Sequence, residues 1–266
     1  MRKLNVIKIG GNSIDDEVQF NHFIASISTL NEAFVIVHGG GKWTTDLAEK
    51  LNISQQLIEG RRVTNAETLK IATMVYAGYI NKTIVALLQK NNVNSIGLSG
   101  ADGNLIEAKK RNNDGVDYGF VGDISTESIN ATFLNSLLNA GLTPVICAIT
   151  HDKNGQLLNT NADTIANVIA TSVVHLFDVR LIYCFEKKGV LLNSEDENSV
   201  IENLSFETFQ DLKNKGTINK GMIPKLENCF QALASGVKEI GIIKADNCVN
   251  YITKNNHEGT RITQRI

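Results

Sequence analysis

A lysine lies inside an apolar run near the N-terminus, directly before two glycines. Val6, Ile7 and Ile9 are typical of a buried strand that ends at Gly10-Gly11, and Lys8 interrupts it. Burying an unpaired ammonium group is costly, and glycines let the backbone approach a ligand because they carry no Cβ. The stretch therefore indicates a cation and backbone amides directed at an anion such as phosphate. The alternative is a lysine that reaches the sheet edge, followed by an ordinary glycine turn.

A second glycine cluster, His38-Gly39-Gly40-Gly41, lies between a predicted strand over 34–37 and a predicted helix over 42–51. It places unhindered amides at a helix N-terminus, where the donors and the helix dipole both favour an anion. The alternative is a turn that only packs the helix against the sheet. His38 has no partner histidine or carboxylate nearby in the sequence, and we interpret it as structural.

Arginines precede the long helix predicted over 65–89. In Gly60-Arg61-Arg62-Val63-Thr64, Thr64 is predicted to cap this helix together with Glu67. A guanidinium group held there can bind a substrate carboxylate through two parallel hydrogen bonds. Two solvated surface arginines are the alternative.

Two further segments place polar side chains at predicted helix starts. Asn159-Thr160-Asn161-Ala162-Asp163 supplies two amides and a carboxylate, which is more than one helix cap requires. Lys220-Gly221-Met222-Ile223-Pro224-Lys225 supplies cations at a helix N-terminus, where the dipole disfavours them unless they face an anion.

The composition is that of a globular protein. The 266 residues are 42% apolar and 20% charged, with a net charge of −2, so nothing calls for nucleic acid or an acidic membrane surface as a partner. The four cysteines are far apart and lack Cys-x-x-Cys spacing, which argues against zinc and disulfides. No signal-peptide h-region and no apolar run of about 18 residues occur. We therefore expect a cytoplasmic protein without a membrane partner.

Strands alternate with helices, which predicts an α/β three-layer sandwich with a central, mostly parallel sheet and helices on both faces. Hairpin or irregular segments are expected in 52–63 and 105–123. Strands are expected near 4–9, 34–37, 95–98, 143–149, 156–158, 181–184, 239–244 and 259–262, and helices near 16–29, 42–51, 65–89, 126–140, 162–174, 206–215 and 222–235.

The glycine clusters indicate where a ligand binds. Glycines at 10–11, 39–41 and 99–103 all follow predicted strands, and ligands of such sheets bind beyond the carboxyl ends of the strands. The sequence lacks Gly-x-x-x-x-Gly-Lys-Ser/Thr and Gly-x-Gly-x-x-Gly, so it supports neither a P-loop nor a dinucleotide fingerprint.

Five motifs, taken in order, resemble the amino acid kinase family: Lys-x-Gly-Gly, His-Gly-Gly-Gly, Gly-x-Arg-Val-Thr, Asn-x-Asn-Ala-Asp and Gly-Met-Ile-Pro-Lys. The resemblance covers residues 4 to about 262. It implies one amino acid kinase domain over 1–266, with acyl-glutamate bound by about 1–175 and ATP by about 176–266. The implied activity is ATP-dependent phosphorylation of the γ-carboxylate of N-acetyl-L-glutamate, or of another N-acyl-glutamate, in the second step of arginine biosynthesis.

The resemblance also implies a role for each motif residue. Lys8 and Lys225 would flank the transferred phosphoryl group, Asp163 would hold the two lysines, and the amides of Gly11 and Gly40 would complete the catalytic set. Mg²⁺ would be carried by the nucleotide phosphates, so no protein ligand to a metal is expected. The acyl-glutamate would be bound by Gly40, Gly41, Arg62, Asn159 and Asn161. The nucleotide would be bound by Gly10, Gly11, Glu186, Gly189, Thr217, Gly221 and Lys225.

Two departures qualify the resemblance. The family usually has Thr/Ser-Asp/Asn before its Gly-Val, whereas this chain has Phe185-Glu186-Lys187-Lys188-Gly189, which leaves the adenosine contacts open. The chain begins almost at its first strand, without the N-terminal helix of arginine-regulated hexamers, so a homodimer without arginine feedback is expected. N-succinyl-glutamate as the substrate, a sibling amino acid or carbamate kinase, and a non-catalytic nucleotide or metabolite sensor are the alternatives.

Overall fold

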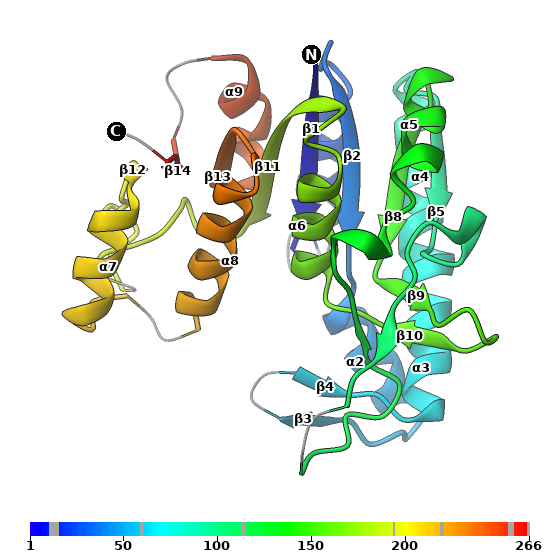
Figure 1. Cartoon of the computed structure of the whole chain (residues 1–266). Coiled ribbons are helices and arrows are strands. Elements are labelled where there is room, and N and C mark those ends of the chain that lie inside the picture. The colour runs from blue at the N-terminus through cyan, green and yellow to red at the C-terminus, as the bar shows by residue number, and fades with distance from the viewer. Residues whose placement is uncertain are drawn as a thin grey trace. The chain divides into compact units, whose positions relative to one another are not determined.

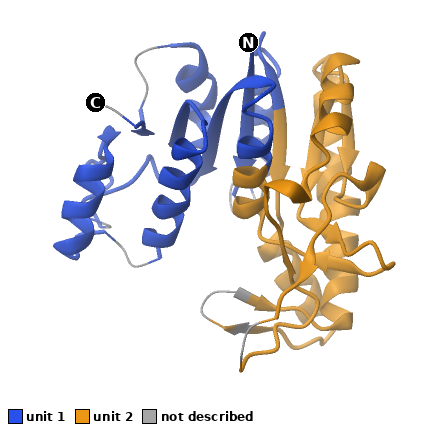
Figure 2. Cartoon of the chain, in the orientation of Figure 1, with its two compact units in different colours: residues 1–34, 169–266 blue, residues 35–168 orange. Residues whose placement is uncertain are grey.

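The computed structural model describes residues 1–10, 16–58, 61–112, 115–193, 195–218, 221–254 and 258–264. The chain divides into two compact units (Figure 2): unit 1 comprises 1–34 and 169–266, and unit 2 comprises 35–168. The two boundaries fall inside strand β2 (Ala33–His38) and helix α6 (Ala162–Ser172).

The strands of unit 1 form a mostly parallel sheet (Figure 1). The order of these strands is β12 (Asn203–Leu204), β14 (Thr260–Ile262), β13 (Glu239–Lys244), β11 (Phe177–Phe185) and β1 (Arg2–Ile9). Neighbouring strands run parallel except for β13 and β14, which are antiparallel. Strand β1 pairs with β11 along its whole length, and its residues from Leu4 to Ile9 are all buried, as in a sheet that is covered on both faces.

Helices α1 (Glu17–Ile27), α7 (Phe206–Asn214), α8 (Ile223–Ala234) and α9 (Cys248–Thr253) complete unit 1. Asp16 caps α1, because its Oδ1 accepts a hydrogen bond of 3.0 Å from the Gln19 amide. Helices α8 and α9 both contact β13, and α7 packs against α8. The helix predicted near 16–29 is present as α1, and its buried face consists of Phe20, Phe23, Ile24 and Ile27.

Unit 2 contains a parallel arrangement of β2, β8 (Thr143–Cys147) and β5 (Ser95–Leu98). Helices α4 (Asn81–Lys90) and α5 (Ala131–Asn139) contact β8, and α2 (Gly41–Lys50) follows β2 directly. Three short antiparallel pairs accompany these elements: β3 (Gln56–Ile58) with β4 (Arg61–Val63), β6 (Lys109–Lys110) with β7 (Gly122–Asp123), and β9 (Ile149–His151) with β10 (Leu157–Asn159).

The long helix predicted over 65–89 is continuous. Helix α3 (Ala66–Thr73) passes into a π-helical segment, Met74–Ile80, and then into α4. The helix is therefore widened around Gly78 and is not broken there. By length and apolar content, Ala66–Lys90 would suffice to cross a membrane. We interpret it as a core helix, because Ile71, Ile80 and other apolar residues of this helix are buried and α4 contacts two sheet strands.

The predicted cap of this helix is wrong by one residue. Asn65 is the cap, and its Oδ1 accepts a hydrogen bond of 2.8 Å from the Thr68 amide. Thr64 is instead held in an extended bridge, where its amide donates to the Tyr118 carbonyl and its carbonyl accepts from the Phe120 amide. Tertiary backbone pairing thus overrides the local capping preference. The mostly parallel sheet with helices confirms the predicted fold class.

Candidate active site

The two lysines predicted to flank a phosphoryl group lie against the same aromatic ring in unit 1. The Lys8 Nζ atom is 5.0 Å from the centroid of the Phe185 ring, and the Lys225 Nζ atom is 3.8 Å from it. Lys8 is only 8% exposed, although it carries a charge. Lys8 and Lys225 come from segments that are far apart in the sequence, so the fold brings them together at the carboxyl end of β11.

The start of helix α8 favours an anion. Lys225 lies in its first turn behind Pro224, and no side chain hydrogen-bonds to the helix as a cap. A cation at this positive end of the dipole costs about 0.3–1 kcal/mol, which a bound anion would reverse. The sequence-based expectation of a cation at a helix start is confirmed for Lys225, whereas Lys220 lies outside the described residues.

Gly10 has no side chain and so leaves space beside Lys8 and Phe185. Its amide donates a hydrogen bond of 3.0 Å to the Cys184 carbonyl and so extends the pairing of β1 with β11. A Cβ at this position would lie 3.4 Å from Cδ1 of Phe185 and 3.9 Å from Nζ of Lys8. The missing side chain therefore keeps the surroundings of the lysine open. Gly11 lies outside the described residues.

The remaining predicted nucleotide residues are spread along unit 1. Glu186, Thr217 and Gly221 are exposed. Gly189 is buried, and a Cβ there would lie 2.6 Å from Oγ1 of Thr260, so packing against β14 requires a glycine at this position. Contact of these residues with a nucleotide stays a prediction.

In unit 2, two helix N-termini lie close to each other. Gly40 is the N-cap of α2, and no side chain caps this helix. A Cβ on Gly39 would lie 3.7 Å from Cβ of Ala162, the first residue of α6. Because both helices direct the positive ends of their dipoles to this place, the turn favours an anion.

Gly40 cannot be replaced without rearrangement. A Cβ at this position would lie 2.9 Å from Cδ1 of Tyr76 and would also collide with Cδ1 of Ile80. Both residues belong to the π-helical segment. The Gly40 carbonyl accepts hydrogen bonds from the amide and the hydroxyl group of Thr44, at 3.0 and 3.1 Å. The glycine turn is thus fixed from two sides.

His38 is a buried, neutral residue with two partners. Its Nδ1 lies 2.9 Å from the Gly39 carbonyl, and its Nε2 lies 3.1 Å from Nδ2 of Asn81. Nδ1 therefore carries the proton, and Nε2 accepts. Burial lowers the pKa of His38 to about 4. These contacts support the structural role expected for this histidine.

Arg62 is held against the start of α2. Its Nη2 donates to the Gly41 carbonyl at 2.9 Å and to Oγ1 of Thr45 at 2.8 Å, and its Nη1 donates to Oε1 of Gln55. Gln55 is anchored in turn, because its Nε2 donates to the buried Thr68 hydroxyl group at 3.1 Å. The alternative of a freely solvated side chain is therefore wrong for Arg62.

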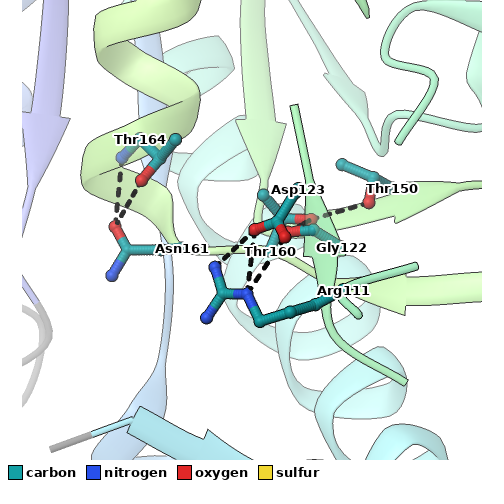
Figure 3. Close-up of polar contacts among 7 residues, drawn as sticks. All are labelled: Arg111, Gly122, Asp123, Thr150, Thr160, Asn161 and Thr164. Atoms are coloured by element: carbon teal, nitrogen blue, oxygen red, sulfur yellow. Dashed lines mark hydrogen bonds and ion pairs between the residues drawn. The ribbon is translucent and has the colours of Figure 1, made fainter. Parts of the chain in front are cut away.

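Asn159 and Arg62 are linked through Thr64. The Asn159 Nδ2 donates to Oγ1 of Thr64 at 3.1 Å, and this hydroxyl group donates to the Arg62 carbonyl at 3.3 Å. Asn161 caps α6, and its Oδ1 accepts from the Thr164 amide at 3.0 Å (Figure 3). The structure thus joins three of the predicted substrate residues, Gly41, Arg62 and Asn159, in one hydrogen-bond network, and Asn161 follows Asn159 by two positions.

An ion pair that the sequence did not reveal lies next to this network. Arg111 donates from Nε and Nη2 to Oδ1 of Asp123, at 2.9 and 2.5 Å (Figure 3). The neighbouring Gly122 carbonyl accepts from the Thr160 hydroxyl group at 3.3 Å. The only signal in the sequence is a basic run opposite an acidic residue in a predicted hairpin region. Asp123 neutralises the Arg111 charge, and the ion pair links β7 to the residue that follows β6.

Asp163 lies in the first turn of α6, where a carboxylate is favourable to the helix dipole. It belongs to unit 2, and the two lysines belong to unit 1. Its contact with them stays a prediction.

Known proteins are similar to the chain over its whole length. Residues 3–244 match the Amino acid kinase family. A protein of Cytophaga hutchinsonii named acetylglutamate kinase is 48% identical over 263 residues, which are 98% of this chain and 99% of the relative. Another acetylglutamate kinase, from Phocaeicola vulgatus, is 49% identical over 91% of this chain and 94% of its own length.

A solved structure of N-acetylglutamate synthase from Neisseria gonorrhoeae, in complex with coenzyme A and N-acetyl-glutamate, shares the fold. Its TM-score is 0.85 at 22% identity, with coverage of 100% of this chain. The chain spans 61% of the length of that synthase. With the matched family model and the close relatives, these findings lead to one conclusion: the chain belongs to the amino acid kinase family.

Proposed function

We propose that this protein is an acetylglutamate kinase, which transfers the γ-phosphoryl group of ATP to the γ-carboxylate of N-acetyl-L-glutamate in arginine biosynthesis. The observation that carries the proposal is the convergence of Lys8 and Lys225 on one ring in unit 1. The name of a relative that is 48% identical over nearly the whole chain supports the same activity.

In this reaction a carboxylate oxygen forms a bond to the γ-phosphorus of ATP. The bond from that phosphorus to the oxygen bridging to the β-phosphate breaks, and its electron pair leaves with ADP. The products are the acyl phosphate and ADP. No general base is needed, because the nucleophile is already ionised. Catalysis of phosphoryl transfer is mostly positioning and charge stabilisation, which two ammonium groups can supply.

The network around Arg62 fits recognition of a carboxylate. Its Nη2 already serves two acceptors, Gly41 and Thr45, while its Nη1 serves the amide oxygen of Gln55. An amide oxygen resembles one carboxylate oxygen in size and in accepting capacity. We infer that a substrate carboxylate takes the place of the Gln55 amide oxygen on Arg62.

ATP is proposed to bind with Mg²⁺. The ion would be held by the nucleotide phosphates, where it would neutralise part of their charge. Lys8 and Lys225 would then neutralise charge on the protein side.

A cytoplasmic homodimer is proposed as the working form. Light scattering after size-exclusion chromatography tests it, and the expected mass is twice the 29.1 kDa of one chain. A mass of one chain, independent of concentration, would contradict the dimer.

A coupled assay of ADP release tests the activity, with N-acetyl- and N-succinyl-glutamate as acceptors. Trapping the product with hydroxylamine identifies the acyl phosphate. Turnover with N-acetyl-glutamate is expected, and turnover with N-succinyl-glutamate alone would reassign the acyl group. Turnover with carbamate or aspartate alone would indicate a sibling kinase. ATP binding in calorimetry without turnover of any acceptor would favour a sensor and overturn the proposal.

A further inference from the structure

The aromatic residue between the two lysines is Phe185, the last residue of β11. The register places Lys8 of β1 opposite Tyr183 of β11. Side chains two residues apart on a strand share a face, so Phe185 lies on the same face as Tyr183 and Lys8. Lys225, from the first turn of α8, reaches the same ring.

The Tyr183 ring supports the orientation of the Phe185 ring. The rings of Tyr183 and Phe185 are stacked with centroids 6.1 Å apart and an interplanar angle of 6°. Tyr183 is 1% exposed, so it is a rigid support. Gly10 leaves the side of the ring clear, because even a Cβ there would approach Cδ1 of Phe185 to 3.4 Å. Tyr183 therefore supports the ring from the same strand, and Gly10 leaves space beside it.

We propose that Phe185 is a positioning residue that holds the ammonium groups of Lys8 and Lys225 together through cation–π contacts. Two ammonium groups in one place repel each other, and the negative face of an aromatic ring offsets part of this repulsion. The ring thus arranges both cations before a phosphate arrives. The effect on catalysis rests on the proposed function, whereas the arrangement of the lysines does not.

The first test compares substitutions that keep or remove the aromatic face. Phe185→Leu keeps an apolar side chain but has no π system, and Phe185→Tyr keeps the ring. For Phe185→Leu we expect kcat to fall about tenfold, as the usual strength of cation–π contacts implies, with KM for the acyl-glutamate changed less than twofold. Phe185→Tyr is expected to restore kcat to within about threefold of the native rate.

A sharper test replaces Phe185 site-specifically with mono-, di- and trifluorinated phenylalanine. Fluorine withdraws electron density from the ring face and changes its shape little. We expect log kcat to fall stepwise with the number of fluorines. Phe209 provides the matched control, because it is a buried ring of the same unit that stacks on Phe230 at 5.3 Å. The same series at Phe209 is expected to leave kcat unchanged. A flat series at Phe185 would overturn the positioning role.

Spectroscopy separates this inference from the proposed activity. In protein with ¹³C-labelled lysine and no nucleotide, we expect the Cε protons of Lys8 and Lys225 to be shifted upfield by the ring current. These shifts should disappear in Phe185→Leu and persist in Phe185→Tyr. Unshifted lysine signals in the native protein would refute the arrangement even if the enzyme is active. Shifted signals in a protein that releases no ADP would retain the arrangement and refute only the activity.

Discussion

The two units hold their candidate site residues in different ways. In unit 2, Arg62 and Asn159 are fixed by directional hydrogen bonds to main-chain and side-chain acceptors. In unit 1, Lys8 and Lys225 share an aromatic ring, which attracts a cation without fixing its direction. Directional hydrogen bonds fix how the Arg62 and Asn159 groups point, whereas a shared ring fixes where two ammonium groups lie but not how their N–H bonds point. The difference teaches that the two units constrain their candidate residues by different kinds of contact.

The largest expected effect comes from removing a charge in unit 1. Lys8→Met keeps the length of the side chain but removes the ammonium group. We expect kcat for ADP release to fall about 100- to 1,000-fold, because lost stabilisation of developing charge has this size, while thermal unfolding shows an intact fold. Lys3→Met is the matched control on the same strand, since Lys3 is paired with Glu32 at 2.9 Å and is exposed. An unchanged rate in Lys8→Met would remove Lys8 from the mechanism.

The next prediction compares the glycine turns of the two units. Gly40→Ala is expected to lower the free energy of unfolding by about 3 kcal/mol, because the new Cβ overlaps Tyr76 and Ile80. Gly10→Ala is expected to cost less than about 1.5 kcal/mol, since its Cβ would meet only the Cys184 carbonyl more closely than usual, at 3.2 Å. Urea unfolding of both variants measures the difference. Equal losses would mean that the two turns are equally constrained.

Buried His38 in unit 2 is expected to make stability depend on pH. Burial lowers the pKa of His38 from about 6.5 in the unfolded chain to about 4. As the pH falls from 6.5 to 4, the unfolded chain therefore takes up a proton that folded His38 does not bind. His38 is then expected to reduce stability by about 3 kcal/mol in total. His38→Gln, which retains donor and acceptor atoms, should flatten this part of the curve of unfolding free energy against pH. Parallel curves would exclude the histidine as the cause.

The smallest expected effect tests the internal partner of Arg62. If a substrate carboxylate displaces the Gln55 amide oxygen, Gln55→Ala removes a competitor, and KM for the acyl-glutamate should fall about two- to fivefold with kcat nearly unchanged. If Gln55 instead orients Arg62, KM should rise. Ser54→Ala serves as a neighbouring control. Steady-state kinetics with varied acyl-glutamate distinguish the two outcomes.

Local patterns in the sequence predicted much of the architecture. The helix near 16–29 and the strand ends before Gly10 and Gly39 depend on residues close together in the chain, and both predictions hold. Strand β12 has two residues and helix α9 six, which is too few for a periodic pattern to show. The cap at Thr64 was misassigned because its backbone pairs with a distant segment around residue 119.

The contacts that hold the site residues could not be predicted from local patterns in the sequence. Gln55 and Thr68 are 13 positions apart, Arg111 and Asp123 are 12 positions apart, and no motif links either pair. Phe185 appeared in the sequence only as a departure from a family pattern. Its contact with two lysines follows from strand register and from the position of α8, and both are properties of the folded chain.

The π-helical segment between α3 and α4 changes the direction in which the apolar side of the helix faces. Helix α3 must direct its apolar side toward α2 and β10, whereas α4 must direct its own toward β5 and β8. An uninterrupted α-helix of 25 residues would fix one rotation between these two sides. The wider turn of Met74–Ile80 changes that rotation without ending the helix. One continuous helix can thus pack against the glycine turn at Gly40 and also against the sheet.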